Sequence, residues 1–418
     1  MRGEIITIGD ELLSGRVMNL NGCYASSRLS AMGFEVGSIA AVGDDPIDIA
    51  NVLKRAMARS DFVIVTGGLG TTEDDITTKT VSEVLKRPLI LNQVILDNIK
   101  LFLEKRNLPW NDTLEKLALL PEGASLVDPR GRRCGFTVTE KGRPLFFLPG
   151  VPEEMQDMMD KCIIPHLMAL ASHKQYYATR TLKLFNVTEH HIGSDLKGFE
   201  RTLPGLTVGY YPNFPEVHVV LTVRGDDQQE VQTILSRAEA GAMERIGANV
   251  IARDHETLES VVGRLLLEHK MTLALAESCT GGLIGHRITE VSGSSEYFER
   301  GFVVYSNRAK VEELNVDPRV LEEFGAVSGQ TAEAMAEGVR RVSGASMGLS
   351  VTGIAGPTGA TPGKPVGTVY IGLATEKGVV SGRKNFSGKR WQVKRLSAHT
   401  ALDWIRRYFA GDPFFRGI

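Results

Sequence analysis

Two short, continuously apolar runs constrain the fold of this 418-residue chain most strongly. They span residues 62–66 and 144–148, and a glycine follows each of them within two residues. Apolar runs of this length are typical of strands that are buried on both faces in a parallel sheet. Neighbouring segments predict strands at 4–8 and 34–42 and helices at 20–32, 46–58 and 153–161. This βαβ rhythm predicts a doubly wound α/β domain over residues 1–168, with ligands at the carboxyl ends of its strands.

Two further domains are predicted downstream. Residues 172–250 indicate a small α+β module for linking or dimerising, with strands at 180–185, 207–211 and 218–224 and helices at 189–196 and 228–246. Residues 254–413 indicate a second α/β domain. Its strands are expected at 271–276, 300–306, 347–352 and 367–374, and its helices at 257–268, 280–290, 328–341 and 391–408.

Charge and cysteine usage exclude several classes of protein. The chain has 48 basic and 50 acidic residues and a net charge of −2, which argues against a general nucleic-acid or membrane-surface binder. We find neither the apolar core of a signal peptide nor an apolar run of about 18 residues. The four cysteines are far apart and form no Cys-x-x-Cys pair. We therefore expect a cytoplasmic protein with reduced thiols and no membrane partner.

A serine and a lysine are the first candidates for chemistry. Ser278 and Lys310 each follow an apolar, strand-like run, so a hydroxyl and an amine can meet at one edge of a sheet. Lys310 can activate Ser278 as a nucleophile without histidine if its pKa is lowered by burial or a neighbouring cation. Taken singly, Ser278 is more simply a helix N-cap and Lys310 a solvated helix charge. Cys279 is an alternative nucleophile, although a buried, unactivated thiol is commoner.

Candidate binding groups lie in the same part of the chain. They comprise backbone N–H groups at an expected helix start, a glycine-rich loop after a strand, and an arginine before the last helix. Helix-start N–H groups bind phosphates or developing oxyanions, and glycines let the backbone approach a ligand closely. Each feature alone is weak, and the arginine alone is a surface charge. The residues are Thr280, Gly281, Gly282, Thr352, Gly353 and Arg390.

Taken together, these segments resemble a known family. The ordered motifs are AESCTGG (276–282), FERGFVVYSNRAK (298–310), GAVS (325–328), SVTGIAGPTG (350–359), KPVGTVYIGLAT (364–375) and FSGKR (386–390). Their order and spacing closely resemble the C-terminal domain of the CinA family, which also occurs as a stand-alone nicotinamide-mononucleotide (NMN) deamidase. The resemblance covers essentially the whole domain. It implies hydrolysis of NMN to nicotinate mononucleotide and ammonia.

The resemblance also implies roles for individual residues. The family's serine matches Ser278, its lysine Lys310 and its tyrosine Tyr305, and its loop threonine and its arginine match Thr352 and Arg390. We expect Ser278 to attack the amide carbon while Lys310, assisted by Tyr305, takes the proton and delivers it to the leaving ammonia. The oxyanion would be held by N–H groups of 280–282 or 352–353, and Arg390 would hold the phosphate or orient the site. No metal is required for this step.

The N-terminal domain carries its own motifs. These are GDELLSG (9–15), TGGLGTTEDDIT (66–77) and LPGVPEEM (148–155), a glycine-rich turn after a strand together with clusters of carboxylates. Such glycines wrap a phosphate, and carboxylates hold a hard divalent ion that bridges phosphoryl oxygens. An equally good interpretation is that the acidic pair at 74–75 only complements a helix N-terminus.

This ordered set resembles the molybdopterin-binding-like domain of CinA proteins, related to enzymes of the MogA and MoeA type. The resemblance implies hydrolysis of ADP-ribose to AMP and ribose 5-phosphate with a divalent metal (Mg, Mn or Co). Asp75 is the first expected metal ligand, followed by Asp10, Glu11, Asp74 and Glu154, and the phosphate-cradling residues are Gly67, Gly68 and Gly70. The chain departs from the family pattern at Thr71, in segment 111–118 and at 131–135.

The middle module is similar to the small KH-like domain of CinA proteins. We see no Gly-x-x-Gly loop flanked by basic residues, so a structural role is favoured over RNA binding. The leading hypothesis is thus a bifunctional hydrolase of pyridine-nucleotide recycling that acts on NMN and ADP-ribose, without nucleic-acid partners and as a homodimer. One alternative is an active deamidase whose N-terminal domain binds nucleotide or molybdopterin without catalysis. Another alternative is that the chain is an interaction protein in DNA uptake (competence) or in the response to DNA damage.

Overall fold

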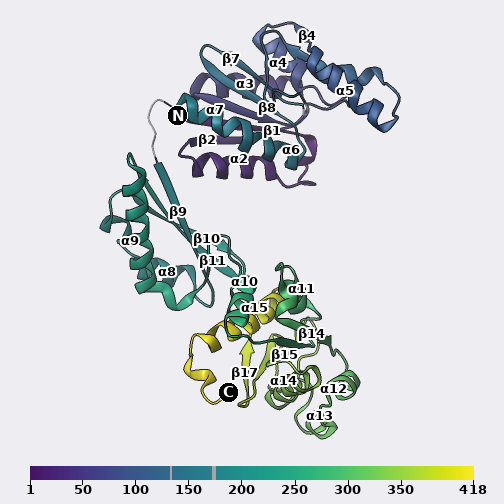
Figure 1. Ribbon diagram of the computed structural model, residues 1–418, viewed down its shortest axis with the longest axis vertical. Coiled ribbons are helices and arrows are strands. Elements are labelled where there is room, and N and C mark those ends of the chain that lie inside the picture. The colour runs from purple at the N-terminus through teal and green to yellow at the C-terminus, as the bar shows by residue number, and fades with distance from the viewer. Residues whose placement is uncertain (132–133, 172–175) are drawn as a thin grey trace. The chain divides into compact units, whose positions relative to one another are not determined.

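The computed structural model describes residues 1–131, 134–171 and 176–418. The chain forms two compact units, Met1–Ala178 with Val223–Thr233, and Thr179–Thr222 with Ile234–Ile418. Figure 1 shows the order of the elements within each part of the chain. Within the described residues, no helix is both long enough and apolar enough to span a membrane.

The N-terminal domain is built on a six-stranded sheet of order β2-β1-β3-β8-β7-β6. The first four strands are parallel, while β7 and β6 are antiparallel additions at one edge. The strands are β1 (Arg2–Ile8), β2 (Glu35–Val42), β3 (Phe62–Thr66), β6 (Ser125–Leu126), β7 (Phe136–Glu140) and β8 (Arg143–Leu148). The predicted doubly wound domain is confirmed, since the two apolar runs are β3 and β8 at the centre of this sheet.

Helices cover both faces of this sheet (Figure 1). One buried cluster joins the sheet to α2 (Leu20–Ala31), α6 (Pro152–Met158) and α7 (Ile164–Leu170), with a π-helical turn, Met159–Ile163, between the last two. The opposite cluster includes residues of α3 (Pro46–Arg59), α4 (Thr77–Leu85) and α5 (Gln93–Arg106). The remaining elements are α1 (Asp10–Leu13), the β4–β5 pair (Leu89–Leu91, Leu119–Pro121) and the 3-10 segment Asp112–Ala118.

The middle module has a four-stranded sheet of order β10-β11-β9-β12 and two helices. The strands are β9 (Tyr176–Leu184), β10 (Leu206–Asn213), β11 (Glu216–Gly225) and β12 (Val250–Arg253), and the helices are α8 (Glu189–Asp195) and α9 (Gln228–Ile246). Two residues separate β10 from β11, so these strands form a tight hairpin. The module is a small α+β domain, as predicted.

The C-terminal domain has a five-stranded sheet of order β14-β13-β15-β16-β17. Strands β14 (Phe298–Val303), β13 (Leu273–Glu277) and β15 (Met347–Gly353) are parallel. Strands β16 (Thr368–Ala374) and β17 (Val379–Asn385) are antiparallel, and β17 was not predicted. One core cluster includes residues of α10 (Leu258–Glu268), α11 (Leu283–Thr289) and α15 (Arg390–Phe409), and the other includes residues of α12 (Asn307–Leu314), α13 (Pro318–Phe324) and α14 (Gly329–Ser343).

Candidate active site

Ser278 and Lys310 meet at the carboxyl edge of the C-terminal sheet. Strands β13 and β14 are parallel neighbours, Ser278 directly follows β13, and Lys310 lies in α12 shortly after β14. The side chain of Ser306 accepts a hydrogen bond from the Ala309 N–H and thereby caps α12. This short connection carries Lys310 back over the sheet edge, where its Nζ lies 3.3 Å from the Ser278 Oγ. The predicted hydroxyl–amine pair is therefore present in the structure.

Lys310 is buried, which overturns its interpretation as a solvated helix charge. Its side chain is among the largest fully buried ones in the described chain, at 1% exposure. The ammonium donates to the Val304 carbonyl at 2.9 Å and lies within 3.4–3.5 Å of the Tyr305 and Ser306 carbonyls. Burial disfavours the charged form and lowers the pKa of Lys310 below its usual value of 10.5. The residue thus has the environment that a catalytic base requires.

The turn between Ser278 and α11 excludes the N-cap interpretation of the serine. The N-cap of α11 is Gly282, four residues further on. Gly281 and Gly282 have φ values of +60° and +88°, which keep the chain out of the right-handed helix that was predicted to start at 280. Ser278 therefore stands on the turn and caps no helix. Cys279 is only 5% exposed, and burial raises the pKa of its thiol to about 12, so it is no activated nucleophile.

Glu277 stabilises this turn and was missed by the sequence analysis. Its carboxylate is 2% exposed and accepts hydrogen bonds from the backbone N–H groups of Ile284, at 3.1 Å, and Gly285, at 2.8 Å. A carboxylate at this position suits the positive end of a helix. Two N–H groups of the first turn of α11 are thus bonded within the protein itself. An acidic residue that ends a strand just before a candidate nucleophile was the available signal.

Arg390 ties three segments of the site together. Its guanidinium donates to the Gly356 carbonyl at 2.7 Å and to the Tyr305 hydroxyl at 3.0 Å. The glycine-rich loop, the strand β14 exit and the start of α15 are therefore held at one place. Tyr305 is 61% exposed, and its hydroxyl bonds to Arg390, whereas Lys310 contacts only its backbone carbonyl. The structure thus brings the tyrosine to the arginine and not to the lysine amine.

The two loop residues predicted to bind substrate occupy packed positions. Thr352 is 1% exposed, and its hydroxyl donates to the Ala326 carbonyl at 2.6 Å. A methyl group on Gly353 would lie 2.8 Å from the Thr368 carbonyl oxygen, so glycine is needed for the close approach of β15 to β16. Thr280 is fully buried, and among the described residues its hydroxyl has no hydrogen-bond partner.

Lys394 is a further basic residue at the site, beside Lys310 and Arg390, and the sequence analysis did not identify it. It follows Arg390 by four residues on α15, so the two side chains share one face of the helix. A methyl group on Gly281 would lie 3.6 Å from the Lys394 Nζ, which places the amine beside the turn that carries Ser278. The i,i+4 spacing of two basic residues at a helix start was the signal.

In the N-terminal domain, the predicted glycine-rich turn adjoins the β8 loop. The Gly67 N–H donates to the Leu148 carbonyl at 3.2 Å, and the Thr66 hydroxyl donates to the Pro149 carbonyl at 2.7 Å. A methyl group on Gly67 would lie 2.2 Å from the Ile8 carbonyl oxygen. The ends of β1, β3 and β8 therefore meet at one sheet edge, as the doubly wound fold requires.

Asp75 folds back over this turn. Its Oδ2 accepts from the backbone N–H and the hydroxyl of Thr72, at 2.9 and 2.5 Å. Lys116 donates to the Thr72 carbonyl at 2.5 Å, so the altered segment 111–118 still brings a basic group to the loop. Gly68, Gly70, Asp75, Lys116 and Cys134 line a pocket of about 10 Å³. Residues 132–133 of the altered 131–135 pattern lie outside the described residues.

The predicted metal ligands fall into two groups. Burial raises the pKa of Asp44, and the nearby carboxylates of Asp10, Glu11 and Asp74 raise it further. The second group is Asp75 and Glu154, which both lie near Cys134. The pKa of the Cys134 thiol is raised to about 11, mainly by burial and further by these two carboxylates. Among the described residues, no three His, Cys, Asp or Glu side chains converge into a metal-binding group. Asp44 was missed by the sequence analysis, although it follows the strand next to β1.

Comparisons with known proteins cover all three domains. Family models described as "Probable molybdopterin binding domain", "Damage-inducible protein CinA KH domain" and "CinA C-terminal domain" match residues 4–169, 179–252 and 255–409. A "CinA-like protein" of Geotalea uraniireducens is 42% identical over 408 residues, with 97% of each chain covered. Another from Syntrophus aciditrophicus is 43% identical over 413 residues, with 98% of each chain covered.

Solved structures match the chain over a shorter length. The competence/damage inducible protein CihA from Agrobacterium tumefaciens is 38% identical with a TM-score of 0.35, covering 36% of this chain and 93% of that one. A competence-damaged protein superfamily member from Escherichia coli is 29% identical with a TM-score of 0.36, covering 37% and 92%.

Proposed function

The chain belongs to the CinA family, and from that premise we propose that it is a bifunctional hydrolase of pyridine-nucleotide recycling. Its C-terminal domain would hydrolyse the carboxamide of NMN to nicotinate mononucleotide and ammonia. Its N-terminal domain would hydrolyse ADP-ribose to AMP and ribose 5-phosphate with a divalent metal. The single observation that carries the deamidase proposal is the buried Lys310 amine 3.3 Å from the Ser278 hydroxyl.

The pair supports an acyl-enzyme mechanism. The neutral Lys310 amine accepts the Ser278 hydroxyl proton while Oγ attacks the carboxamide carbon. The resulting ammonium returns a proton to the amide nitrogen, the C–N bond breaks, and ammonia leaves. Water then attacks the ester while Lys310 takes its proton, the bond between the acyl carbon and Ser278 Oγ breaks as Lys310 returns that proton to Oγ, and nicotinate mononucleotide is released. Glu277 accepts from the N–H groups of Ile284 and Gly285, and the Gly281 N–H donates to the Ser278 carbonyl at 3.2 Å. We therefore assign oxyanion stabilisation to the N–H groups of Thr280 and Gly282.

The basic groups of α15 suit the phosphate of NMN. Arg390 is fixed by Tyr305 and Gly356, and Lys394 lies beside Gly281. Phosphate is a common ligand of both side chains, Arg through its planar fork and Lys as a point charge. On this proposal Tyr305 is a positioning residue that orients Arg390 rather than a second proton carrier.

Ammonia release from NMN tests the deamidase proposal. The purified full chain should release ammonia at an equal rate with and without EDTA, and the other product should be nicotinate mononucleotide by mass. Nicotinamide riboside, which lacks the phosphate, should be a poorer substrate. Absence of ammonia from the wild-type protein, or complete loss of its release with EDTA, would overturn the proposal.

The N-terminal proposal is supported by the acidic surroundings of Asp44 and by the loop of Asp75. The pKa of Asp44 is raised by burial and by the neighbouring carboxylates of Asp10, Glu11 and Asp74, and such a concentration of negative charge is what Mg²⁺ or Mn²⁺ neutralises. Mg²⁺ sites often use only one or two carboxylates, with water and substrate phosphates completing the coordination, so a preformed three-residue cluster is not required. A bound metal would supply charge neutralisation at the pyrophosphate. Asp75, Asp74, Asp10, Glu11 and Glu154 are the candidates to hold it, and Gly67, Gly68 and Gly70 would face the phosphates.

Metal-dependent turnover of ADP-ribose tests this second activity. The full chain should form AMP and ribose 5-phosphate when Mg²⁺, Mn²⁺ or Co²⁺ is added, and EDTA should abolish both products. Ammonia release from NMN serves as the internal control for folded protein. Binding of ADP-ribose without turnover under any of these metals would instead indicate a non-catalytic N-terminal domain.

A further inference from the structure

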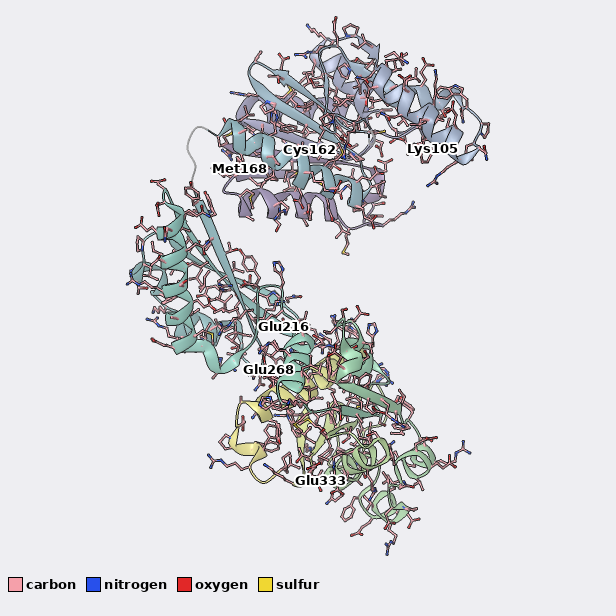
Figure 2. All side chains as sticks on the ribbon, in the orientation of Figure 1. Lys105, Cys162, Met168, Glu216, Glu268 and Glu333 are labelled. Carbon is pink, nitrogen blue, oxygen red and sulfur yellow. The ribbon has the colours of Figure 1, made fainter. Side chains whose placement is uncertain are left out.

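A second cavity in the C-terminal unit lies outside the deamidase site. Glu216, labelled in Figure 2, begins β11 at the turn of the β10–β11 hairpin. This turn lies against α11 and α15 of the C-terminal domain. The cavity between them has a volume of about 400 Å³, within the range of small-molecule sites. In the described part of the chain, its lining includes none of Ser278, Lys310, Tyr305 and Arg390.

A buried histidine with an unmatched donor is among the residues that line this cavity. His399 is 1% exposed, and its Nδ1 lies 3.1 Å from the Arg287 guanidinium. A guanidinium can only donate, so Nδ1 accepts and the proton of the neutral ring is on Nε2. Burial and the neighbouring Arg287 and Arg395 lower the pKa of His399 to about 3, which keeps the ring neutral. Among the described residues, Nε2 has no hydrogen-bond partner.

The unmatched Nε2–H calls for an acceptor. The nearest carboxylate oxygen, Oε1 of Glu216, is 3.6 Å away, beyond hydrogen-bond range. The other oxygen of Glu216 already accepts from His218 at 2.7 Å. A buried donor without a partner is destabilising, so an occupant with acceptor oxygens would be favoured.

The charges around the cavity favour an anion. Its lining contains three fixed cations, Lys183, Arg287 and Arg395, and two carboxylates, Glu216 and Glu259. Glu259 is paired with Arg287, whereas Glu216 accepts a hydrogen bond from His218 and keeps its negative charge. Lys183 donates to the Glu256 carbonyl at 2.5 Å. Within the described chain, Arg395 has neither a hydrogen bond nor an ion pair, so its guanidinium is available for a ligand.

The remaining wall of the cavity is apolar. Phe214, Pro215 and Leu283 line it beside the basic groups. Pockets that bind small molecules commonly combine an apolar wall with a few convergent polar groups. A bare inorganic anion would leave this wall and much of the volume unfilled, whereas an anionic group on a larger organic body would use both.

We propose that this cavity binds a phosphomonoester, with its phosphate on Arg395 and the Nε2–H of His399 and its organic part against Phe214 and Leu283. The ligand class includes mononucleotides and sugar phosphates. The site is separate from the serine–lysine pair, so the proposal stands or falls independently of NMN deamidation. Its nearness to α11 and α15 places the ligand on two helices that also border the deamidase site.

Calorimetric titration of the full chain with AMP, ribose 5-phosphate, inorganic phosphate and nicotinate tests the proposal. AMP and ribose 5-phosphate distinguish a nucleotide from a sugar-phosphate preference, and nicotinate reports whether a carboxylate suffices. Arg395→Glu should weaken binding of the preferred phosphomonoester about tenfold or more, because it reverses the charge at the phosphate. Arg341→Glu, on the exposed face of α14, is the matched control and should leave binding unchanged.

Glu216→Gln gives a prediction of the opposite sign. Removing this carboxylate should strengthen phosphomonoester binding several-fold, because a repulsive charge disappears while the side-chain shape is kept. Circular dichroism and thermal unfolding should match wild type in all three variants, which shows that the C-terminal domain is folded whether or not the chain deamidates NMN. Equal affinities of wild type and Arg395→Glu for both phosphomonoesters, tighter binding of nicotinate than of either, or weaker binding in Glu216→Gln would overturn the proposal.

Discussion

Lys310 must lose a proton before it can accept one from Ser278. On the proposed mechanism its neutral form is the active one, so kcat/KM for NMN should rise with pH as the residue deprotonates. Burial lowers the pKa of Lys310 from 10.5, so the rising limb of the profile should lie below the titration range of a surface lysine. A pH–rate profile from about pH 5 to 10 checks this expectation. Activity that is flat over that range, or that falls throughout it, would contradict the role of Lys310 as the base.

Lys310→Arg separates base chemistry from positive charge. The guanidinium keeps the charge but is not deprotonated in proteins, so ammonia release should fall to background. Lys377→Arg, at an exposed position of the same domain, is the matched control and should retain full activity. Substantial activity in Lys310→Arg would show that Lys310 acts only as a cation.

Lys394 is expected to bind the phosphate of NMN. Lys394→Ala should raise KM for NMN about tenfold or more with a small change in kcat, since a charged hydrogen bond contributes about 1.5–3 kcal/mol. The same change should hardly affect turnover of nicotinamide riboside, which has no phosphate. Lys377→Ala is the control. An equal loss with both substrates would assign Lys394 to the fold of the Ser278 turn instead.

At the scale of elements, α14 packs closely against strand β16 of the C-terminal sheet. A methyl group on Gly372 of β16 would lie 2.4 Å from the Ala332 carbonyl oxygen of α14. Gly372→Ala should therefore lower the free energy of unfolding by about 1–3 kcal/mol through overpacking. Gly193→Ala in α8 has open space around the added methyl and should be neutral or stabilising by up to about 1 kcal/mol. Denaturant unfolding of both variants measures the difference, and equal effects would contradict the packing argument.

Elements with a single strong pattern were predictable. The apolar runs at 62–66 and 144–148 are the central strands β3 and β8, and Asp45 caps α3 by accepting from the N–H groups of Ile47 and Asp48. The helix expected from 280 begins at Leu283 instead, because two glycines with positive φ precede it. Strand β17 was missed because its residues, VVSGRKN, are partly exposed and polar and lack a buried face.

The candidate site was predictable only in part, because local motifs are visible in the sequence whereas contacts between distant residues are not. The candidate catalytic and binding residues occur in short motifs, so Ser278, Lys310 and Arg390 were identified as candidates before any contact was known. Glu277, Lys394 and Asp44 act through contacts that only the folded chain makes. Likewise, the Tyr305 hydroxyl reaches Arg390 across a gap of 85 residues in sequence, which no local pattern encodes.

At the scale of the whole molecule, the two proposed activities reside in separately folded domains with their own cores. Asp75→Asn should abolish metal-dependent ADP-ribose hydrolysis while leaving ammonia release from NMN within about twofold of wild type, because sites with separate cores and no shared partners act nearly additively. Both rates can be measured on one preparation. Loss of both activities in this variant would show that the domains depend on each other.

The most direct test of the account is ammonia release from NMN by wild type, Ser278→Ala and Ser295→Ala under identical conditions. Ser295 is exposed in the same domain and serves as the matched control. The account predicts that wild type and Ser295→Ala release ammonia at equal rates, while Ser278→Ala falls to background with unchanged circular dichroism and thermal unfolding. Wild-type rates in a folded Ser278→Ala protein would contradict the serine–lysine site.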